Sequence, residues 1–378
     1  MAPPEAATST SIRYRPLGRS GSEIRLLELQ PATTNDINER VVCRLVHERL
    51  SDSSDFIGLS ALYGDINVTE TIFVNGAAIS IPVHLAEALR YMRAVFLAAA
   101  LPTPNASMTD LQGAAAMPAP LPTPPKKAPG WLRSLLKTVR HIITEQDAPR
   151  GGTPPLRIWL DLLCINGWDE REESERRLHM ARAYRHAKMV VGWLGLKDST
   201  SDFAIEIVKA LDKHMPATFG EPGDREVHPN DYAPVLQWYE PIAHLSRIPE
   251  GVTEPREVPS YKAISDFLNR PYFRNAWILD EMSKARFPAF LLGDDIVSWM
   301  QVLRLNRINE DVKDHGANIF PDELRGLLEY LPMGSVYTFL KEFDNRQRQE
   351  GITPAMLTTT SSVRSSSSMT VTRTKSKQ

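Results

Sequence analysis

The chain has 378 residues, of which 42% are hydrophobic, so it is long enough to bury one large core or two ordinary ones. Its 44 basic and 46 acidic side chains give a net charge of −2, which excludes a global field that attracts nucleic acid or an anionic membrane. Two cysteines, Cys43 and Cys164, lie far apart in apolar runs, which argues against a disulfide framework and fits a reducing compartment.

No targeting or membrane segment is evident in the sequence. The apolar stretches are interrupted well before the roughly 18 residues that a membrane-spanning helix needs. The first residues lack the basic start and apolar core of a secretory signal. We therefore expect a cytoplasmic protein with no membrane span and no nucleic-acid partner.

The N-terminal part is predicted to be rich in strands. After an extension over 1–23, apolar runs at 24–30, 41–46, 55–64 and 71–82 suit strands. Asn75-Gly76 divides the last run and predicts a hairpin, because both residues tolerate the positive φ of a type I′ turn. Apolar residues at three- and four-residue spacing then predict a helix over 83–99.

Three segments are predicted to lack regular structure. Residues 101–129 contain eight prolines and six alanines and are expected to form a disordered insertion before a helix over 131–146. Residues 216–260 form a second, loop-rich insertion with a short helix near 233–246. The tail over 351–378 is rich in Ser and Thr and carries basic but no acidic side chains, so it is expected to be disordered.

The middle of the chain alternates between strand and helix patterns. Strands are predicted at 156–166 and 188–195, and helices at 169–187 and 201–214, with Glu172–Arg176 and Glu173–Arg177 as ion pairs within the first helix. A helix near 261–269, a strand or helix near 276–286, an apolar run at 287–293 and a helix after Ile296 follow. This order predicts an α/β fold with a partly parallel sheet flanked by helices.

Several blocks, in order, resemble the heterokaryon incompatibility (HET) domain of filamentous fungi. EIRLLELQP at 24–32, FIGLSALYGD at 56–65 and IFVNGAAISIPVHLAEALRYMR at 72–93 resemble its opening strand, its Leu-Ser-Tyr-x-Trp-Gly block and its hairpin with the following helix. RIWLDLLCINGWDEREESERRLHMARAYRHAKMVVGWLG at 157–195 resembles its most specific block, and RPYFRNAWILDEMSKAR at 270–286 resembles its Arg-x-Trp-x-x-Gln-Glu block. The resemblance covers about residues 24–300, within a domain predicted to run over 24–350.

The resemblance implies a function and also shows departures from the family pattern. It implies a module of fungal non-self recognition that signals programmed cell death, in the manner of innate immunity, through a protein partner or self-association. The family has been compared with TIR domains, a flavodoxin-like fold in which some members cleave NAD with a glutamate. Tyr63, Ala61, Gly167 and Asp280 replace residues usual in the family, so an inactive, degenerate member is a further reading.

Two carboxylates are the candidates for a catalytic role, since a carboxylate can steady an oxocarbenium-like centre or activate water. Glu281 lies in an apolar block, where a charge needs a purpose or a partner. The alternative reading for it is an ion pair with Arg270, Arg274 or Arg286. Asp161 lies near the end of a predicted buried strand, where ligands collect in α/β sheets. Its alternative is a hydrogen bond to backbone or a helix cap.

Four further polar residues are candidate ligand contacts: Ser60, Tyr63, Asn166 and Asp169. Core or turn hydrogen bonds are the alternative for the first two, and helix capping is the alternative for the last two. Four tryptophans are predicted to be core aromatics, namely Trp159, Trp193, Trp277 and Trp299.

Other sites are not signalled by the sequence. It has no P-loop, no Gly-x-Ser-x-Gly elbow and no paired His or Cys spacing, so no cofactor and no metal is expected. Two classes of function remain: a recognition module, or an NAD glycohydrolase-like enzyme that uses Glu281 or Asp161 and takes NAD as its substrate.

Overall fold

The computed structural model describes residues 11–18, 21–34, 36–51, 54–100, 129–133, 135, 156–232, 237–275, 282–332 and 334–349. The predicted insertion over 101–129 and the tail over 351–378 lie almost entirely outside these residues, as does most of the helix predicted over 131–146. The expectations for those segments therefore stay predictions.

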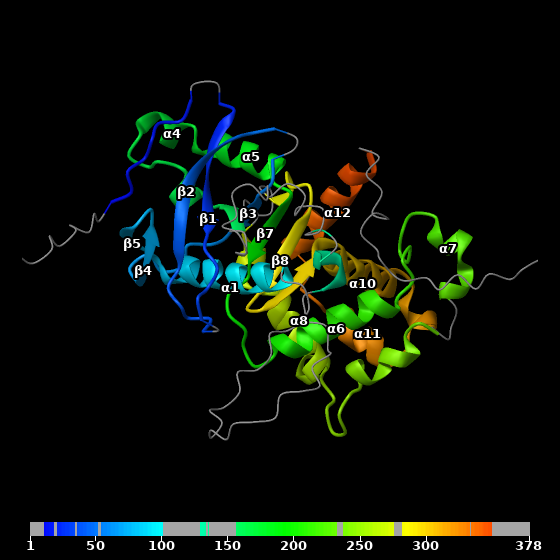
Figure 1. Ribbon diagram of the computed structural model, residues 1–378. Helices are drawn as coiled ribbons and strands as arrows, with labels where there is room; N and C mark the ends of the chain where they lie inside the picture. Colours follow the sequence, from blue (N-terminus) through cyan, green and yellow to red (C-terminus); the bar gives the residue numbers. More distant parts are fainter. Residues whose placement is uncertain are drawn as a thin grey trace, which may run out of the picture.

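The described strands form one nine-stranded mixed sheet in the order β5-β4-β2-β1-β6-β3-β7-β8-β9 (Figure 1). The strands are β1 (Glu23–Leu29), β2 (Val42–Arg49), β3 (Ile57–Ser60), β4 (Thr69–Val74), β5 (Ala77–Pro82), β6 (Leu156–Trp159), β7 (Met189–Trp193), β8 (Pro288–Leu292) and β9 (Asp295–Ser298). The predicted α/β class is confirmed.

The N-terminal strands form the antiparallel side of the sheet. β1 pairs with β2 along its whole length, from Glu23 opposite Arg49 to Leu29 opposite Cys43. β4 and β5 form the predicted hairpin, in which Asn75 has φ 52° and Gly76 has φ 79°. These positive angles are those of a type I′ turn, and they confirm the prediction from Asn-Gly.

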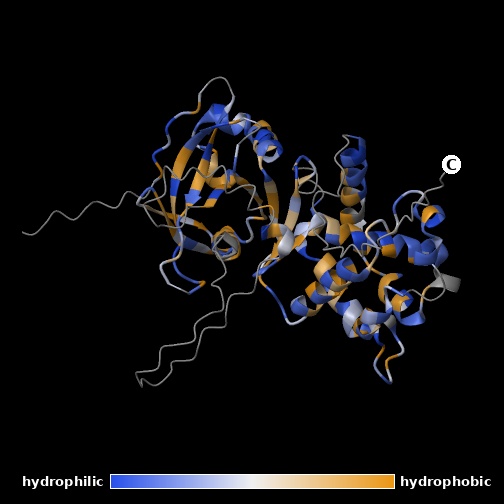
Figure 2. Cartoon of the chain, turned by 45° about the vertical axis from the view of Figure 1, so that its right-hand side comes forward, coloured by the Kyte–Doolittle hydropathy of each residue, from blue (hydrophilic) through white to orange (hydrophobic). Residues whose placement is uncertain are grey.

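The centre of the sheet is parallel. β3 lies between β6 and β7, and β7 pairs with β8, all in parallel register. Every residue of β3, β7 and β8 is buried, as expected for strands covered on both faces. The apolar colouring of these strands is visible in Figure 2.

The structure corrects one predicted strand. β6 ends at Trp159, and residues Asp161–Cys164 form a helical turn, α3, where the sequence suggested that the strand ran to 166. The apolar pattern continues because the turn is also buried, at Leu163 and Cys164, so periodicity did not distinguish the two.

The predicted helix over 169–187 is two helices. α4 (Glu170–Ser174) and α5 (Arg176–His186) are separated at Glu175, whose ψ of 7° breaks the run. The two predicted i,i+4 ion pairs are wrong. Glu172 pairs with Arg25, and Glu173 pairs with Arg176 three residues on.

Helices line the sheet and extend beyond β8. α1 (Val83–Ala100) runs across the strands, and α4 and α5 lie near one end of β1 and β2 (Figure 1). The remaining α-helices are α6 (Ser201–His214), α7 (Asp224–Val227), α8 (Pro259–Leu268), α10 (Trp299–Ile319), α11 (Asp322–Leu328) and α12 (Gly334–Gln349). The predicted loop-rich stretch 216–260 also contains three 3-10 helices, Pro229–Tyr232, Glu240–Ser246 and Pro255–Glu257, and a fourth follows α8 at Pro271–Arg274.

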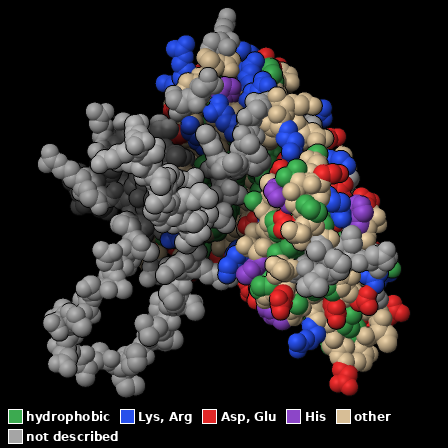
Figure 3. Space-filling view, turned by 90° about the vertical axis from the view of Figure 1, so that its right-hand side faces the viewer, with side chains coloured by type: hydrophobic (Ala, Val, Ile, Leu, Met, Phe, Trp, Pro, Cys, Tyr) green, Lys and Arg blue, Asp and Glu red, His purple; other side chains and the backbone are tan. Residues whose placement is uncertain are grey.

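The core joins the sheet to these helices. Trp159, Trp193 and Trp299 are at most 3% exposed, which confirms the prediction of core aromatics, while Trp277 lies outside the described residues. Both cysteines are buried free thiols. On the face of the molecule seen in Figure 3, acidic and basic side chains are interspersed. Within the described ranges, no helix is long and apolar enough to cross a bilayer.

Candidate functional site

The carboxyl ends of β6, β3 and β7 lie side by side, because these strands are parallel neighbours. After β3 the chain leads to β4, which lies on the β6 side of the sheet, and after β7 it leads to β8 on the other side. Ligands of open α/β sheets bind where neighbouring strands diverge in this way. The carboxyl ends of β3 and β7 therefore mark the candidate site, with the end of β6 beside it.

Asp161 lies directly after β6 as the first residue of α3. Its side chain is 12% exposed, and its Oδ2 accepts a hydrogen bond from the Tyr63 hydroxyl and one from Arg176 Nη1 at 3.2 Å. Burial, followed by the Asp161 charge and hydrogen bond, raises the pKa of Tyr63, so the phenol stays protonated as a donor. The structure thus brings two predicted site residues, Asp161 and Tyr63, into direct contact.

Arg176 joins this cluster to α5. Its Nη2 lies 2.7 Å from Glu173 Oε2, and that hydrogen bond is the main cause of the raised pKa of Arg176. Neither alternative suggested for Asp161, a backbone hydrogen bond or a helix cap, is the contact observed. The residue preceding α3 is Leu160, and Asp161 is held by side chains instead.

Ser60 is the last residue of β3 and lies in the core. It is 2% exposed, and its Oγ accepts a hydrogen bond of 2.9 Å from the Tyr272 hydroxyl. Tyr272 packs on Gly192 of β7, where a Cβ would lie 2.6 Å from the phenol ring carbon and oxygen. The core hydrogen bond predicted as one reading of Ser60 is confirmed.

His84 lies at the point where β3 and β7 diverge, and sequence reasoning did not select it. A Cβ added at Gly64 would lie 3.0 Å from His84 Cβ, and one at Gly195 would lie 3.5 Å from its Cε1. The imidazole lies 6.0 Å from the Trp193 ring, centroid to centroid. Burial lowers the pKa of His84, so it is neutral at pH 7. It makes no hydrogen bond to any described residue.

Arg270 secures the loop that follows β7. Its guanidinium donates to the carbonyls of Leu194 and Leu196, at 3.1 and 2.8 Å, and to the Asp198 carboxylate at 2.8 Å. Burial lowers the pKa of this guanidinium. The sequence blocks that contain His84 and Arg270 did not single out either residue as a site residue, and only the tertiary structure places both beside the loop that follows β7.

Asn166 and Asp169 shape an exposed loop. Asn166 Oδ1 accepts a hydrogen bond from the Trp168 backbone N–H at 3.1 Å. Asp169 caps α4 by accepting from the backbone N–H groups of Arg171 and Glu172 at 3.0 and 3.2 Å, which confirms its capping role. Between them the Trp168 side chain is 94% exposed.

A buried ion pair holds this loop to the sheet. Glu172 Oε2 accepts from the Asn166 backbone N–H at 2.9 Å, and both Glu172 oxygens accept from Arg25 of β1 at 2.7 Å. The Arg25 side chain is fully buried. The loop is therefore fixed at Asn166, at Asp169 and at Glu172.

Glu281, the other proposed catalytic carboxylate, lies outside the described residues together with Asp280. In the part of the chain that the structure describes, no group of three His, Cys, Asp or Glu side chains is placed to hold a metal.

These features define the class of protein: a mixed α/β domain in which polar side chains gather at the carboxyl ends of parallel strands. Residues 125–281 match the family model of the heterokaryon incompatibility protein (HET). Within these residues the chain therefore resembles the heterokaryon incompatibility domain, in agreement with its sequence blocks.

One curated relative matches a large part of the chain. Heterokaryon incompatibility protein 6, OR allele, of Neurospora crassa is 27% identical over an alignment of 188 residues, which covers 46% of this chain and 25% of the relative. The match therefore spans about a quarter of the relative's length. No solved structure matches.

Proposed function

We propose that this chain is a recognition module of fungal heterokaryon incompatibility, which binds a protein partner or a second copy of itself and signals programmed cell death. The match to the HET family and the name of the Neurospora relative support the role in incompatibility. We place the whole HET domain at 24–350, because β1, β2 and the central strands belong to one sheet.

The exposed side chain of Trp168 is the observation that supports binding to a protein partner. A tryptophan exposed to 94% leaves a large apolar surface in water. The hydrogen bonds of Asn166, Asp169 and Glu172 fix the loop around it, so little backbone freedom is lost on binding. Tryptophans in such positions are common anchors of protein interfaces.

The test is expression of the parent chain and of Trp168→Ala in a fungal host, with viability followed at equal protein abundance. We expect the parent to kill cells and the variant to lose most of that effect without a change in folding stability. Val227→Ala is the matched control, because Val227 is 68% exposed on α7, at the opposite side of the molecule in Figure 1. Equal killing by Trp168→Ala and the parent would exclude this surface as the binding site.

A second candidate function is cleavage of NAD, favoured by the position of Asp161 at the carboxyl edge of the sheet. Tyr63 and Arg176 orient its carboxylate, and a carboxylate so held can stabilise positive charge on a ribose. His84 and Arg270, near the divergence of β3 and β7, add a neutral imidazole and a guanidinium to the same edge.

Cellular NAD measured in the same cultures separates the two functions. Depletion by the parent that disappears in Asp161→Asn or Glu281→Ala would support an enzyme. Killing with NAD unchanged would support a binding module alone. Constant NAD and full viability with the parent would support the degenerate-member reading.

A further inference from the structure

The outer edge of β2 is only partly paired. β4 is in register with β2 at Val42 and Cys43, and the chain then turns away at Asn75. The Asn75 side chain makes the last contact, as its Oδ1 accepts from the Leu45 backbone N–H at 2.9 Å. Beyond Leu45 this edge continues to Arg49 without a neighbouring strand among the described residues.

The direction of the free backbone groups follows from the antiparallel ladder. Leu50 N–H donates to Ser22 and Gln30 N–H donates to Val42 O, so the even-numbered residues of β2 bond to β1. The odd-numbered residues face outward. The N–H groups of His47 and Arg49 and the carbonyls of Leu45 and His47 therefore point away from β1, and none bonds to a described residue.

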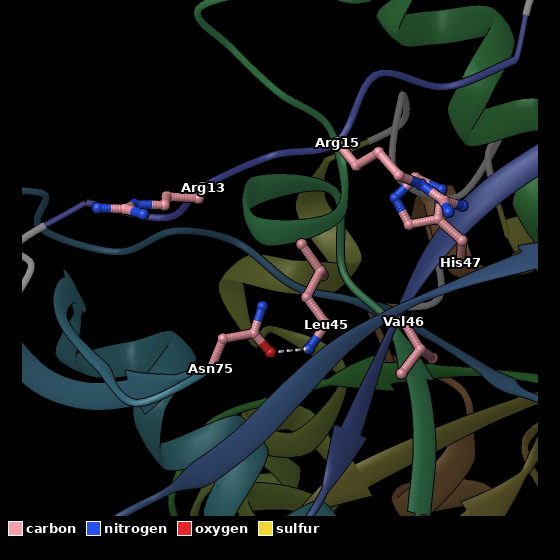
Figure 4. Close-up of a pocket in the computed structure, with 6 residues that line it drawn as sticks. All are labelled: Arg13, Arg15, Leu45, Val46, His47 and Asn75. Carbon is pink, nitrogen blue, oxygen red and sulfur yellow. Dashed lines mark hydrogen bonds between the residues drawn. The ribbon is translucent and has the colours of Figure 1, made fainter.

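A shallow hollow of about 420 Å³ lies along this edge (Figure 4). It is lined by Arg13, Arg15, Leu45, Val46, His47 and Asn75. The edge of β2 forms one wall and the segment 11–18 forms the other. That segment is fixed in place, because Arg25 Nη2 donates to the Arg15 carbonyl at 2.7 Å.

The hollow carries a surplus of positive charge. Arg15 and His47 both lie 2.9 Å from the same carboxylate, that of Glu23. Arg13 is exposed and forms no ion pair with any described residue. Two arginines thus line the hollow, and of these only Arg15 has a carboxylate partner among the described residues.

We propose that an extended acidic segment of a partner protein adds to the free edge of β2 as a further strand, in line with β4. Its backbone would pair with the outward groups of Leu45, His47 and Arg49, and its carboxylates would face Arg13 and Arg15. A second copy of this chain fits less well, because edge-to-edge pairing brings the same arginines together. The proposal does not depend on Trp168 or on any enzymatic activity.

The first test is fluorescence anisotropy with the full chain and a labelled peptide of alternating Glu and Val. Two kinds of matched probe are used: the corresponding Lys and Val peptide, and the acidic peptide N-methylated at alternate residues, made in two forms that each block one edge of the strand. We expect saturable binding of the acidic peptide, and at least tenfold weaker binding of the Lys and Val peptide and of the N-methylated form that blocks the edge facing β2. No binding of the acidic peptide, or binding of both N-methylated forms as strong as that of the unmodified peptide, overturns the proposal.

The second test locates the peptide. Arg13→Glu with Arg15→Glu is expected to weaken binding at least tenfold, whereas Arg256→Glu, an exposed arginine of the 3-10 helix Pro255–Glu257, leaves it unchanged. Amide hydrogen exchange should slow at His47 and Arg49 when the acidic peptide binds, and stay the same at Val46, which faces β1. Binding without slower exchange at His47 and Arg49 places the peptide elsewhere and refutes the inference.

Trp168→Ala should bind the acidic peptide as well as the parent does. The two surfaces can therefore fail independently, and a loss at one leaves the other intact.

Discussion

The ion pair between Arg25 and Glu172 offers the most direct test of how the exposed loop is held. Arg25 is fully buried and donates to both oxygens of Glu172, to the carbonyl of Arg15 and to that of Cys164. Its guanidinium also lies 5.0 Å from the centre of the Tyr14 ring. Replacing Glu172 with Gln leaves this charge buried without its counter-charge.

Breaking a buried pair by removing one partner costs about 3–5 kcal/mol. We expect Glu172→Gln to lose about 3 kcal/mol, since the Gln oxygen can still accept from Arg25 and from the Asn166 N–H. With a urea slope of about 3 kcal/mol per M, the unfolding midpoint falls by about 1 M. Intrinsic fluorescence is a suitable probe, because Trp159 and Trp193 lie in the core.

Two further variants make this prediction specific. Glu170→Gln is the control, because Glu170 is an exposed carboxylate two residues away in α4, and its effect should stay within about 0.5 kcal/mol. Arg25→Met combined with Glu172→Met should recover part of the loss, since an apolar pair of similar volume can replace buried charges. A loss below about 1 kcal/mol for Glu172→Gln, or no recovery in the double variant, would refute the reasoning.

The same pair has a predictable pH dependence. Burial raises the pKa of Glu172, but the hydrogen bonds from Arg25 and Asn166 outweigh burial and hold it below 4.5. A depressed pKa means that the folded state favours the carboxylate, so this stabilisation is present above pH 4.5 and is lost as the pH falls through the folded-state pKa. Glu172→Gln should therefore reduce the loss of stability in acid.

Three further predictions concern other parts of the fold. Because burial lowers the pKa of His84 below 6.5, the stability of the protein should fall as the pH drops below that value. The melting temperature of His84→Asn should therefore depend less on pH than that of the parent. An equal pH dependence of the two would contradict a neutral, buried His84. Gly192→Ala places a Cβ against Tyr272 and should destabilise by about 1–3 kcal/mol in urea, whereas an unchanged midpoint would mean that the ring moves freely. Asn75→Ala strains a residue at φ 52° and removes the acceptor of the Leu45 N–H, so we expect the free energy of unfolding to fall by about 1–2 kcal/mol. Asn75→Gly should lose less, because glycine adopts this angle without strain. The reverse order would show that backbone strain is not the main cause of the loss.

Local sequence patterns determined the elements that neighbouring residues can specify. The Asn75-Gly76 hairpin, the buried runs of β7 and β8 and the cap at Asp169 each depend on a few adjacent residues, and each was predicted. Boundaries that lie inside one continuous sequence pattern were not predicted. The end of β6 at Trp159 and the break before α5 at Glu175 lie within continuous apolar or charged runs.

The candidate site could be predicted from the sequence less completely than the helices and strands. The sequence selected Asp161 and Tyr63 separately, but their contact joins residues 98 positions apart. His84 has no signal in its own segment, and it matters because β3 and β7 diverge around it. Arg25 resembles any charged residue of a strand until Glu172, 147 positions away, is placed beside it.

The sequence by itself therefore determined the class of fold, the HET resemblance and the positions of most strands and helices, because backbone preferences and apolar periodicity act over a few residues. Only the tertiary structure decided which charges are buried in pairs, which part of β2 has no neighbouring strand among the described residues, and which side chains meet at the carboxyl ends of the strands. Those outcomes depend on strand order and register, which bring distant residues together and which no short pattern encodes.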